Sequence, residues 1–335
     1  MSLRRQLIYP VLAIALGGMT ASIFELSNIT QSSLYTHFTY ALLAIGLYGC
    51  VFTINLRELN QNRQIVLGAI TVGVFLKTVI IGAILYFFIK DNIAFLLGVA
   101  VAQIDPLSVA ALLNRETSYL SERAKAILGA WSSFDDPVTV ILSLYILSIV
   151  LQSSNAWLSF QLFVQSSAIN LLVASGIYVI HQFTKRWAGI QLLLLLISLF
   201  IGIYFRLMLA VALTGLFLRP AITQLLSKVV DGAFYTALLL LGLVLINGIS
   251  PINGAIMAFA AVVAQIIVSI ILTRKLHWRD RLHIALAQQN GITAIILALL
   301  FETTYTGVVA VVAPAILLIN LIHFVSNSFI NQKFG

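Results

Sequence analysis

Ser132-Ser133-Phe134-Asp135-Asp136-Pro137 is a polar segment in the middle of an apolar stretch of the chain. A third carboxylate, Asp105, lies in the preceding apolar stretch and also comes directly before a proline, Pro106. A charged carboxylate at the centre of a bilayer costs roughly 2.5–3.5 kcal/mol on insertion scales. Three such residues in two adjacent apolar stretches therefore indicate a function, and we expect them to bind a small cation or a proton.

The composition is that of a polytopic membrane protein. Hydrophobic residues make up 61% of the 335 residues and charged residues only 9%, which is more apolar surface than a soluble chain could bury. No long polar block marks a separate soluble domain, so we expect a single membrane domain over residues 1–335. With about 20 apolar residues per span, the sequence predicts an all-α fold of about twelve transmembrane helices, at 7–25, 34–54, 64–89, 92–113, 123–150, 157–181, 187–203, 205–218, 232–249, 251–273, 281–301 and 306–330.

The basic residues support this count and orient it. If the N-terminus lies inside, sixteen of the 19 lysines and arginines fall in inside segments, Lys90 and Arg206 fall outside, and Lys77 lies within a span. This asymmetry follows the positive-inside rule and predicts cytoplasmic N- and C-termini. The net charge of +8 therefore reflects topology in a lipid bilayer and does not indicate a nucleic-acid partner.

Two spans are predicted to be interrupted near their centres. In span 92–113, Pro106 cannot donate a hydrogen bond to the carbonyl of Ala102, and span 281–301 has Gln288-Gln289-Asn290-Gly291 at its centre. Backbone groups freed inside a membrane need other partners, and transporters use paired broken helices at the midplane to present such groups to ions. We therefore expect spans 3–5 and 10–12 to form inverted repeats. The alternative is amide packing between helices without any function.

Candidate site residues surround these breaks. Asp105, Asp135 and Asp136 are the expected ion and proton ligands, with the hydroxyl groups of Ser132 and Ser133 beside them. Asp136, Asp105 and Ser132 are the ligands expected for a transient monovalent cation, because hard oxygen ligands suit Na⁺, Li⁺ or K⁺. Polar residues at the same level, each also typical of simple helix packing, are Lys77, Gln103, Gln265, Asn290 and Asn320.

Three single residues carry further expectations. Lys77 lies too deep in its span for its amine to reach water easily, so we expect it to face a carboxylate or a helix end. Asp135 and Asp136 cannot both ionise at low cost and should titrate as a coupled pair. A site of this kind holds either a proton or a metal ion. Cys50 is the single cysteine, so an internal disulfide is excluded and we expect a small packing residue.

With these motifs assembled, the chain resembles the monovalent cation/proton antiporters of the cation–proton antiporter superfamily. The resemblance covers nearly the whole chain and is carried by Ala102-Gln103-Ile104-Asp105-Pro106, by Phe134-Asp135-Asp136-Pro137 and by Asn290-Gly291 with the apolar run at 294–299. It implies a sodium/proton antiporter fold with two crossed broken helices, in spans 4 and 11. It also implies a homodimer, with a core part at approximately 64–150 and 251–330 that moves like an elevator. The dimerisation or scaffold part would be approximately 1–63 and 157–249.

The resemblance assigns residue roles and also has departures. It implies Asp136 as the essential carboxylate that carries ion and proton, and an Asp-Asp pair resembles the electrogenic branch. That branch usually has a lysine where this chain has Gln265, and the family usually has threonine where this chain has Ile104. The glutamate and arginine of the electroneutral branch are both absent, at Trp131 and Asn290. We hypothesise that Lys77 supplies the missing positive charge from the opposite repeat.

The function expected is therefore secondary antiport of Na⁺, or of Li⁺ or K⁺, against H⁺, without any cofactor. The expected location is a prokaryotic plasma membrane. Two alternatives are open at this point. A Na⁺-coupled symporter would need groups for an organic substrate, and an intramembrane aspartyl protease would also bring two carboxylates to the midplane. The protease typically uses a Gly-x-Gly-Asp signature, which neither aspartate motif matches.

Overall fold

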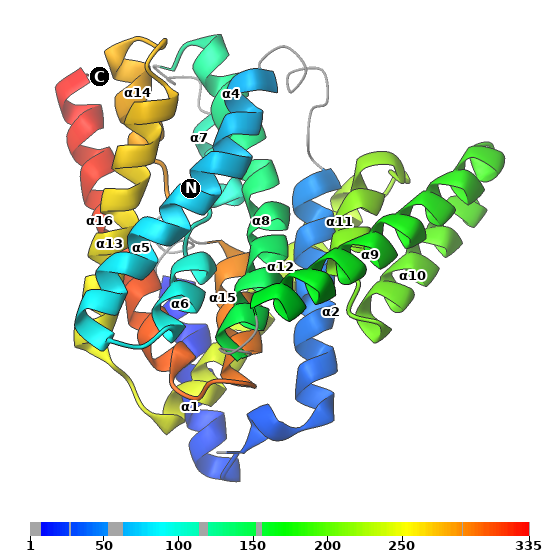
Figure 1. The fold of residues 1–335 in the computed structure, drawn as a ribbon, viewed down its shortest axis with the longest axis horizontal. Coiled ribbons are helices and arrows are strands. Elements are labelled where there is room, and N and C mark those ends of the chain that lie inside the picture. Colours follow the sequence, from blue (N-terminus) through cyan, green and yellow to red (C-terminus); the bar gives the residue numbers. More distant parts are fainter. Residues whose placement is uncertain are drawn as a thin grey trace.

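The computed structural model describes residues 8–26, 28–52, 63–113, 120–151, 156–289 and 291–334. The described part is all-helical, and each of the twelve predicted spans corresponds to one helix or to a broken helix (Figure 1). In chain order the elements are α1 (Tyr9–Phe24), η2 (Ile29–Gln31), α2 (Ser33–Phe52), α4 (Arg63–Gly68), η3 (Ala69–Gly73), α5 (Val74–Ile89), α6 (Ile93–Ala100), α7 (Pro106–Leu113), α8 (Glu122–Leu151), α9 (Ala156–Thr184), α10 (Ala188–Tyr204), α11 (Met208–Phe217), α12 (Thr223–Val244), η4 (Leu245–Asn247), α13 (Pro251–Leu272), α14 (Trp278–Ala285), α15 (Ile292–Glu302) and α16 (Val308–Phe334).

One predicted boundary is clearly displaced. Helix α12 begins at Thr223, whereas the hydropathy pattern placed the start of this span at 232. The added turns contain Gln224, Lys228 and Asp231, which lower the hydropathy without interrupting the helix. Span length marks the apolar part of a helix, whereas the helix itself extends beyond it.

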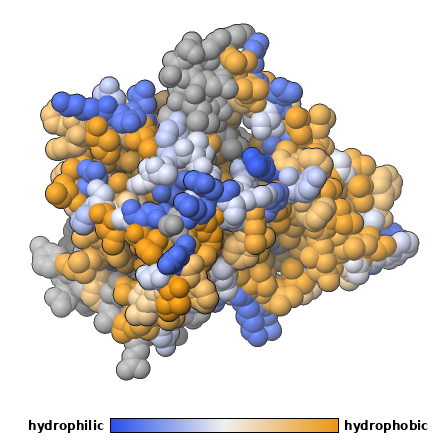
Figure 2. All heavy atoms as spheres, turned by 90° about the horizontal axis from the view of Figure 1, so that it is seen from below, coloured by the Kyte–Doolittle hydropathy of each residue, from blue (hydrophilic) through white to orange (hydrophobic). Residues whose placement is uncertain are grey.

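By length and composition, six of the described helices are apolar enough to cross a membrane, namely the helices at 33–52, 64–89, 160–184, 223–247, 251–272 and 308–326. Shorter apolar helices are α1, α10, α11 and α15. Figure 2 shows apolar side chains over the flanks of the molecule, with polar residues gathered across the middle of that view. Large exposed apolar side chains on α9 and α10, such as Phe183 and Phe200, are typical of surface that faces lipid.

The helices pack in two groups that meet at α2. On one side α5 packs on α6 and α13, and α13 packs on α16. On the other, α11 packs on α9 and α2. In Figure 1, α2 stands between these groups, and it also contacts α8 and α15. Helices α1 and α12 pack on each other, and α12 also contacts α2 and α15. Helix α2 therefore joins the two groups at the level of the candidate site.

Small residues allow α1 and α12 to approach closely. A Cβ atom at Gly17 would lie 2.1 Å from the carbonyl oxygen of Leu239, and one at Gly242 would lie 2.0 Å from that of Ile14. Neither position can hold a larger residue without separating the helices. Such small-residue contacts replace the hydrophobic driving force that is missing between helices in lipid.

Side-chain caps fix the helix that carries the aspartate pair. At the start of α8 the hydroxyl of Ser121 accepts a hydrogen bond from the amide of Ala124 at 3.2 Å. Ser121 in turn donates to Asp280 through its amide at 3.0 Å and through its hydroxyl at 2.6 Å. These bonds tie the beginning of α8 to α14, so the two elements that approach the site are linked at this end.

Candidate functional site

The two interrupted spans meet at their breaks. The first span is non-helical at 101–105, between α6 and α7, and the second between α14 and α15. The backbone amide of Asp105 donates to the carbonyl of Gln288 at 2.9 Å, and Ile104 pairs with Gln289 in an isolated antiparallel bridge. Backbone groups left open by one break are thus partly satisfied by the other, as a membrane interior requires.

The sequence explains where the first break ends. Asp105 caps α7, because its Oδ2 accepts hydrogen bonds from the amide of Ser108 at 3.2 Å and from the Ser108 hydroxyl. Pro106 then occupies the first helical position, where a missing N–H does no harm. An Asp-Pro pair therefore restarts the helix and holds the carboxylate at the break, where Asp105 is only 7% exposed.

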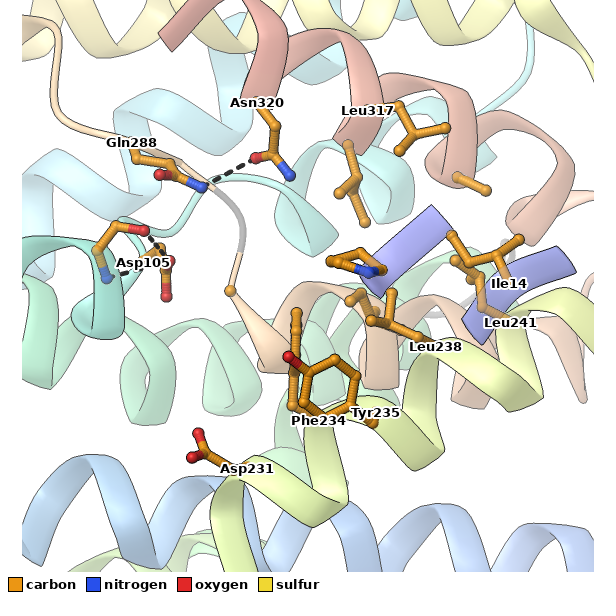
Figure 3. Close-up of a pocket in the computed structure, with 16 residues that line it drawn as sticks. Ile14, Asp105, Asp231, Phe234, Tyr235, Leu238, Leu241, Gln288, Leu317 and Asn320 are labelled. Carbon is orange, nitrogen blue, oxygen red and sulfur yellow. Dashed lines mark hydrogen bonds between the residues drawn. The ribbon is translucent and has the colours of Figure 1, made fainter. Parts of the chain in front are cut away.

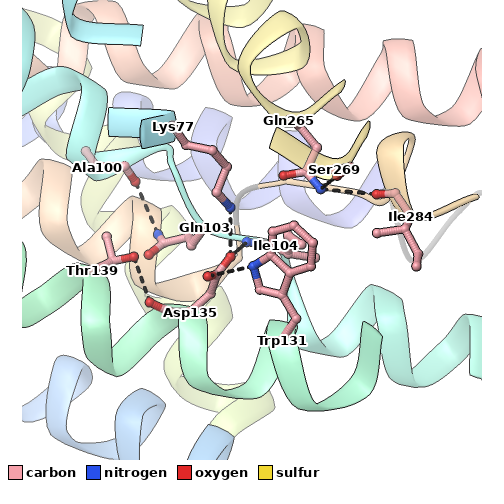
Figure 4. A network of polar contacts seen from close by, with 10 residues as sticks. All are labelled: Lys77, Ala100, Gln103, Ile104, Trp131, Asp135, Thr139, Gln265, Ser269 and Ile284. Atoms are coloured by element: carbon pink, nitrogen blue, oxygen red, sulfur yellow. Dashed lines mark hydrogen bonds and ion pairs between the residues drawn. The ribbon is translucent and has the colours of Figure 1, made fainter. Parts of the chain in front are cut away.

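Asp135 is fully buried and saturated with donors (Figure 4). Its Oδ2 accepts hydrogen bonds from Lys77 Nζ at 2.9 Å and from the amide of Ile104 at 3.0 Å. Its Oδ1 accepts one from Trp131 Nε1 at 3.0 Å. The Lys77 amine is also buried, and it lies 5.4 Å from the centre of the Trp131 ring. A buried ion pair is tolerated when further hydrogen bonds satisfy it, and this one has them.

Asp136 faces different partners on the other side of α8. Its Oδ2 accepts hydrogen bonds from Cys50 Sγ at 3.1 Å and from Thr293 Oγ1 at 2.9 Å. Its Oδ1 is buried and has no hydrogen-bond partner among the described residues. Asp135 is the chain neighbour of Asp136, and Asp105 follows Ile104, whose amide donates to Asp135, so the three carboxylates form one cluster. Neighbours on a helix point about 100° apart, which explains how adjacent residues reach separate surroundings.

A cavity leads to this cluster from one side (Figure 3). Its atom-free volume is about 870 Å³, including its open mouth. Asp105, Gln288 and Asn320 line one wall, where Gln288 Nε2 donates to Asn320 Oδ1 at 3.0 Å. Helix α12 contributes Asp231 and Tyr235 on the opposite wall (Figure 3). Asp105 lines the cavity, whereas Asp135 and Asp136 do not.

A family profile described as "Sodium/hydrogen exchanger, transmembrane" matches residues 2–329. The chain belongs to the sodium/hydrogen exchanger family. Members of this family are secondary transporters that move sodium ions and protons, so the chain is an antiporter-family transporter and the aspartyl protease alternative is excluded. No curated protein sequence matches the chain.

Two solved structures have the same fold as this exchanger-family chain. One is described as the sodium proton antiporter MjNhaP1 from Methanocaldococcus jannaschii at pH 8, with a TM-score of 0.67 and 17% identity. The other is an electron-microscopy map of the same antiporter, with a TM-score of 0.65 and 19% identity. In both comparisons the match covers 99% of this chain and 97% of the other. The predicted sodium/proton antiporter fold is therefore confirmed.

In the exchanger-family fold, some predicted residues form hydrogen bonds with groups other than the carboxylates. The hydroxyls of Ser132 and Ser133 both donate to the carbonyl of Gly129, at 3.1 and 2.8 Å. Gln265 Nε2 donates to Ser269 Oγ at 3.0 Å and to the Ile284 carbonyl at 3.1 Å. The hydrogen bonds of Ser132 and Ser133 are of a common kind, because serine and threonine hydroxyls on helices often donate to a carbonyl of the preceding turn.

Other predicted residues lie at the breaks. Gln103 Nε2 donates to the Ala100 carbonyl at 3.2 Å, while its Oε1 is buried without a partner in the described part of the chain. Asn320 contacts Gln288 at the cavity wall. Lys77 does face a carboxylate, Asp135. Asn290 lies outside the described residues.

Three side-chain contacts of the aspartate pair were missed from the sequence. Trp131 precedes Asp135 by four residues on the same helix, a spacing that could have suggested the contact. Thr293 lies just after the predicted break but was not assigned to the site. Cys50 was expected to be a small packing residue; it is buried, and its thiol also donates to Asp136, a contact that was not predicted. No local signal could have found it, since 86 residues separate the two.

Proposed function

We propose that this protein exchanges a monovalent cation, Na⁺ or else Li⁺ or K⁺, for protons by competition of the two for Asp136 and Asp105. The observation that carries the proposal is the unequal saturation of the buried carboxylates. Asp135 has three donors on its two oxygens, whereas Oδ1 of Asp136 is buried without a partner among the described residues. A desolvated carboxylate oxygen of this kind needs a positive partner, and either a proton or a cation provides one.

We further propose that Lys77 is the counter-charge of the site. Its amine and Asp135 are both buried at 2.9 Å, so each charge is compensated by the other. In the resemblance described above, a lysine would be expected from the helix that here presents Gln265. Gln265 is instead occupied with Ser269 and the Ile284 carbonyl. Lys77 on α5 then leaves Asp136 and Asp105 as the carboxylates that take the exchanged ions.

An elevator movement would give the site access to both sides. The core would comprise approximately 64–150 and 251–330, and the scaffold approximately 1–63 and 157–249. The cavity is lined by both parts, since α1 and α12 contribute one wall and α15 and α16 the other. Among the lining residues, those on α1 lie at 10–14, those on α12 at 231–241 and those on α16 at 313–320. Sliding of the core against the scaffold would close this cavity and open a path to the other side of the membrane.

The remaining assignments are proposals of the same kind. We place the protein in a prokaryotic plasma membrane, and its basic-residue asymmetry supports cytoplasmic termini. We expect a homodimer formed by the scaffold part. The exposed apolar faces of α9 and α10 are compatible with such a contact as well as with lipid.

Vesicle transport tests the function directly. Purified protein is reconstituted into vesicles that are acidic inside, and Na⁺, Li⁺ or K⁺ is added outside with and without an imposed voltage. We expect the pH gradient to dissipate with at least one cation and no organic solute, and the voltage dependence reports the charge moved per cycle. Asp136→Asn should be inert toward every cation. Glu122→Gln, on the same helix with a side chain 90% exposed, is the matched control and should retain exchange. Full exchange by Asp136→Asn would remove Asp136 from the mechanism.

A further inference from the structure

Two donors from different helices converge on a single oxygen of Asp136. Cys50 Sγ, on α2, lies 3.1 Å from Oδ2, and Thr293 Oγ1, on α15, lies 2.9 Å from the same atom. Asp136 itself is on α8, which α2 contacts, as it also contacts α15. The carboxylate of Asp136, on α8, is therefore held by hydrogen bonds from two other helices, α2 and α15.

Both donors are buried with the carboxylate. Asp136 and Thr293 are completely buried, and Cys50 is 7% exposed. Water therefore competes little for these hydrogen bonds, and a hydrogen bond to a charged group in such surroundings fixes geometry as well as adding energy. Cysteine is a weak donor, yet among the described residues Cys50 is one of two side chains that donate to this carboxylate.

The second oxygen of the same carboxylate is left over. Oδ1 of Asp136 is buried and has no hydrogen-bond partner among the described residues. With Oδ2 held from two directions, the carboxylate cannot rotate freely. The surrounding structure therefore fixes the position of Oδ1, and no described residue forms a hydrogen bond with it.

We propose that Cys50 and Thr293 are positioning residues, which hold Oδ2 of Asp136 so that Oδ1 is presented to the transported cation. This deepens the proposed function and rests on it. The pair acts through Asp136 and does not itself contact the cation. Loss of either donor frees the carboxylate to rotate, so the cation loses a pre-arranged ligand and its affinity falls. The maximal rate changes less, because the residues that carry charge are all retained.

The test compares variants that remove the donor with variants that keep it. Cys50→Ala and Thr293→Val remove one donor each, whereas Cys50→Ser and Thr293→Ser retain one. Na⁺-dependent exchange is measured at one alkaline pH, where proton competition is weakest. We expect both donor-free variants to raise the half-saturating Na⁺ concentration by about tenfold, which is the effect expected for a hydrogen bond to a charged group. The maximal rate should stay within about twofold, and the serine variants should remain near the native value.

Val51→Ala is the matched control for lost volume. Val51 is 2% exposed, follows Cys50 on α2 and packs near Gly215 on α11. It makes no contact with Asp136 among the interactions described. A normal half-saturating concentration in this variant shows that a small cavity in α2 is not the cause. Elution as a single species and an unchanged melting temperature confirm that each variant is folded.

A second readout separates this inference from the proposed function. Stabilisation of the purified protein by increasing Na⁺ is measured by thermal unfolding, which reports binding without transport. A native protein that does not exchange cations for protons contradicts the proposed function. If the native protein does exchange, the inference is overturned by a half-saturating concentration within twofold of native in either donor-free variant. It is equally overturned if the serine variants lose as much affinity as the donor-free ones, since volume would then be the cause.

Discussion

Asp135 and Asp136 are adjacent in the sequence, yet the structure treats them in opposite ways. Asp135 points toward α5 and the first break, where Lys77, Trp131 and the amide of Ile104 saturate it. Asp136 points toward α2 and α15, and in the described part of the chain only one of its oxygens has donors. Two adjacent buried carboxylates can therefore divide structural and exchange roles. A carboxylate with all its hydrogen bonds formed is stable, whereas one with an unpaired oxygen can bind a mobile cation or proton.

The largest expected effect is that replacing Asp136 abolishes transport whereas replacing Asp135 lowers stability. Asp136→Asn should abolish exchange and leave stability nearly unchanged. Asp135→Asn strands the buried Lys77 amine, so we expect a loss of about 3–5 kcal/mol in the free energy of unfolding. Denaturation in detergent measures the second effect and vesicle transport the first. The double variant Lys77→Met with Asp135→Leu should recover much of the stability, since it leaves no unpaired charge. Equal stability losses in the two single asparagine variants would contradict the division.

Proton competition at Asp136 should make the half-saturating Na⁺ concentration depend on pH. If a proton and a cation share the same carboxylate, lowering the pH by one unit should raise the half-saturating Na⁺ concentration by up to about tenfold, at constant maximal rate. The sign follows because more protons occupy the site at lower pH, so more cation is needed to displace them. Initial rates over a matrix of pH and Na⁺ concentration measure it. A maximal rate that falls while the half-saturating concentration stays constant would rule out direct competition.

A smaller effect is expected where the cavity meets the cluster. A Cβ atom at Gly291 would lie 2.8 Å from Asp105 Oδ1, so Gly291→Ala should displace that carboxylate. We expect a rise of about fivefold in the half-saturating Na⁺ concentration, because a displaced carboxylate is no longer a pre-arranged ligand. Gly232→Ala is the control, since its Cβ would meet no atom within 4 Å. Native affinity in Gly291→Ala would show that Asp105 does not need its present position.

The smallest effect concerns the opposite wall of the cavity. Asp231 lies on α12 across from Asp105 (Figure 3), and its negative charge should raise the local concentration of cations. Asp231→Asn should raise the half-saturating Na⁺ concentration by about twofold at low ionic strength, with the difference fading as added choline chloride screens the charge. Kinetics at two ionic strengths check this. An effect that is independent of ionic strength would indicate a direct ligand, and the cavity and the cluster would then no longer be separate regions.

Much of the fold could be predicted from the sequence because lipid imposes simple rules. Apolar length marks each span, basic residues mark the loops, and the Asp105-Pro106 pair and the polar run at 288–291 mark the two breaks. All of these signals are local. Where a boundary was displaced, at the start of α12, polar residues continued a helix that hydropathy had ended.

The amino-acid sequence is enough to identify a membrane protein with three carboxylates predicted at one depth. Burial of a charge in lipid carries a free-energy cost wherever the charge occurs along the chain, so such residues stand out. Which carboxylate has all of its oxygens hydrogen-bonded depends on contacts between distant segments of the chain. Lys77 is 58 residues from Asp135, Cys50 is 86 from Asp136, and Thr293 is 157 from Asp136. Such partners are set by how helices cross, and neither periodicity nor spacing along one helix carries that information.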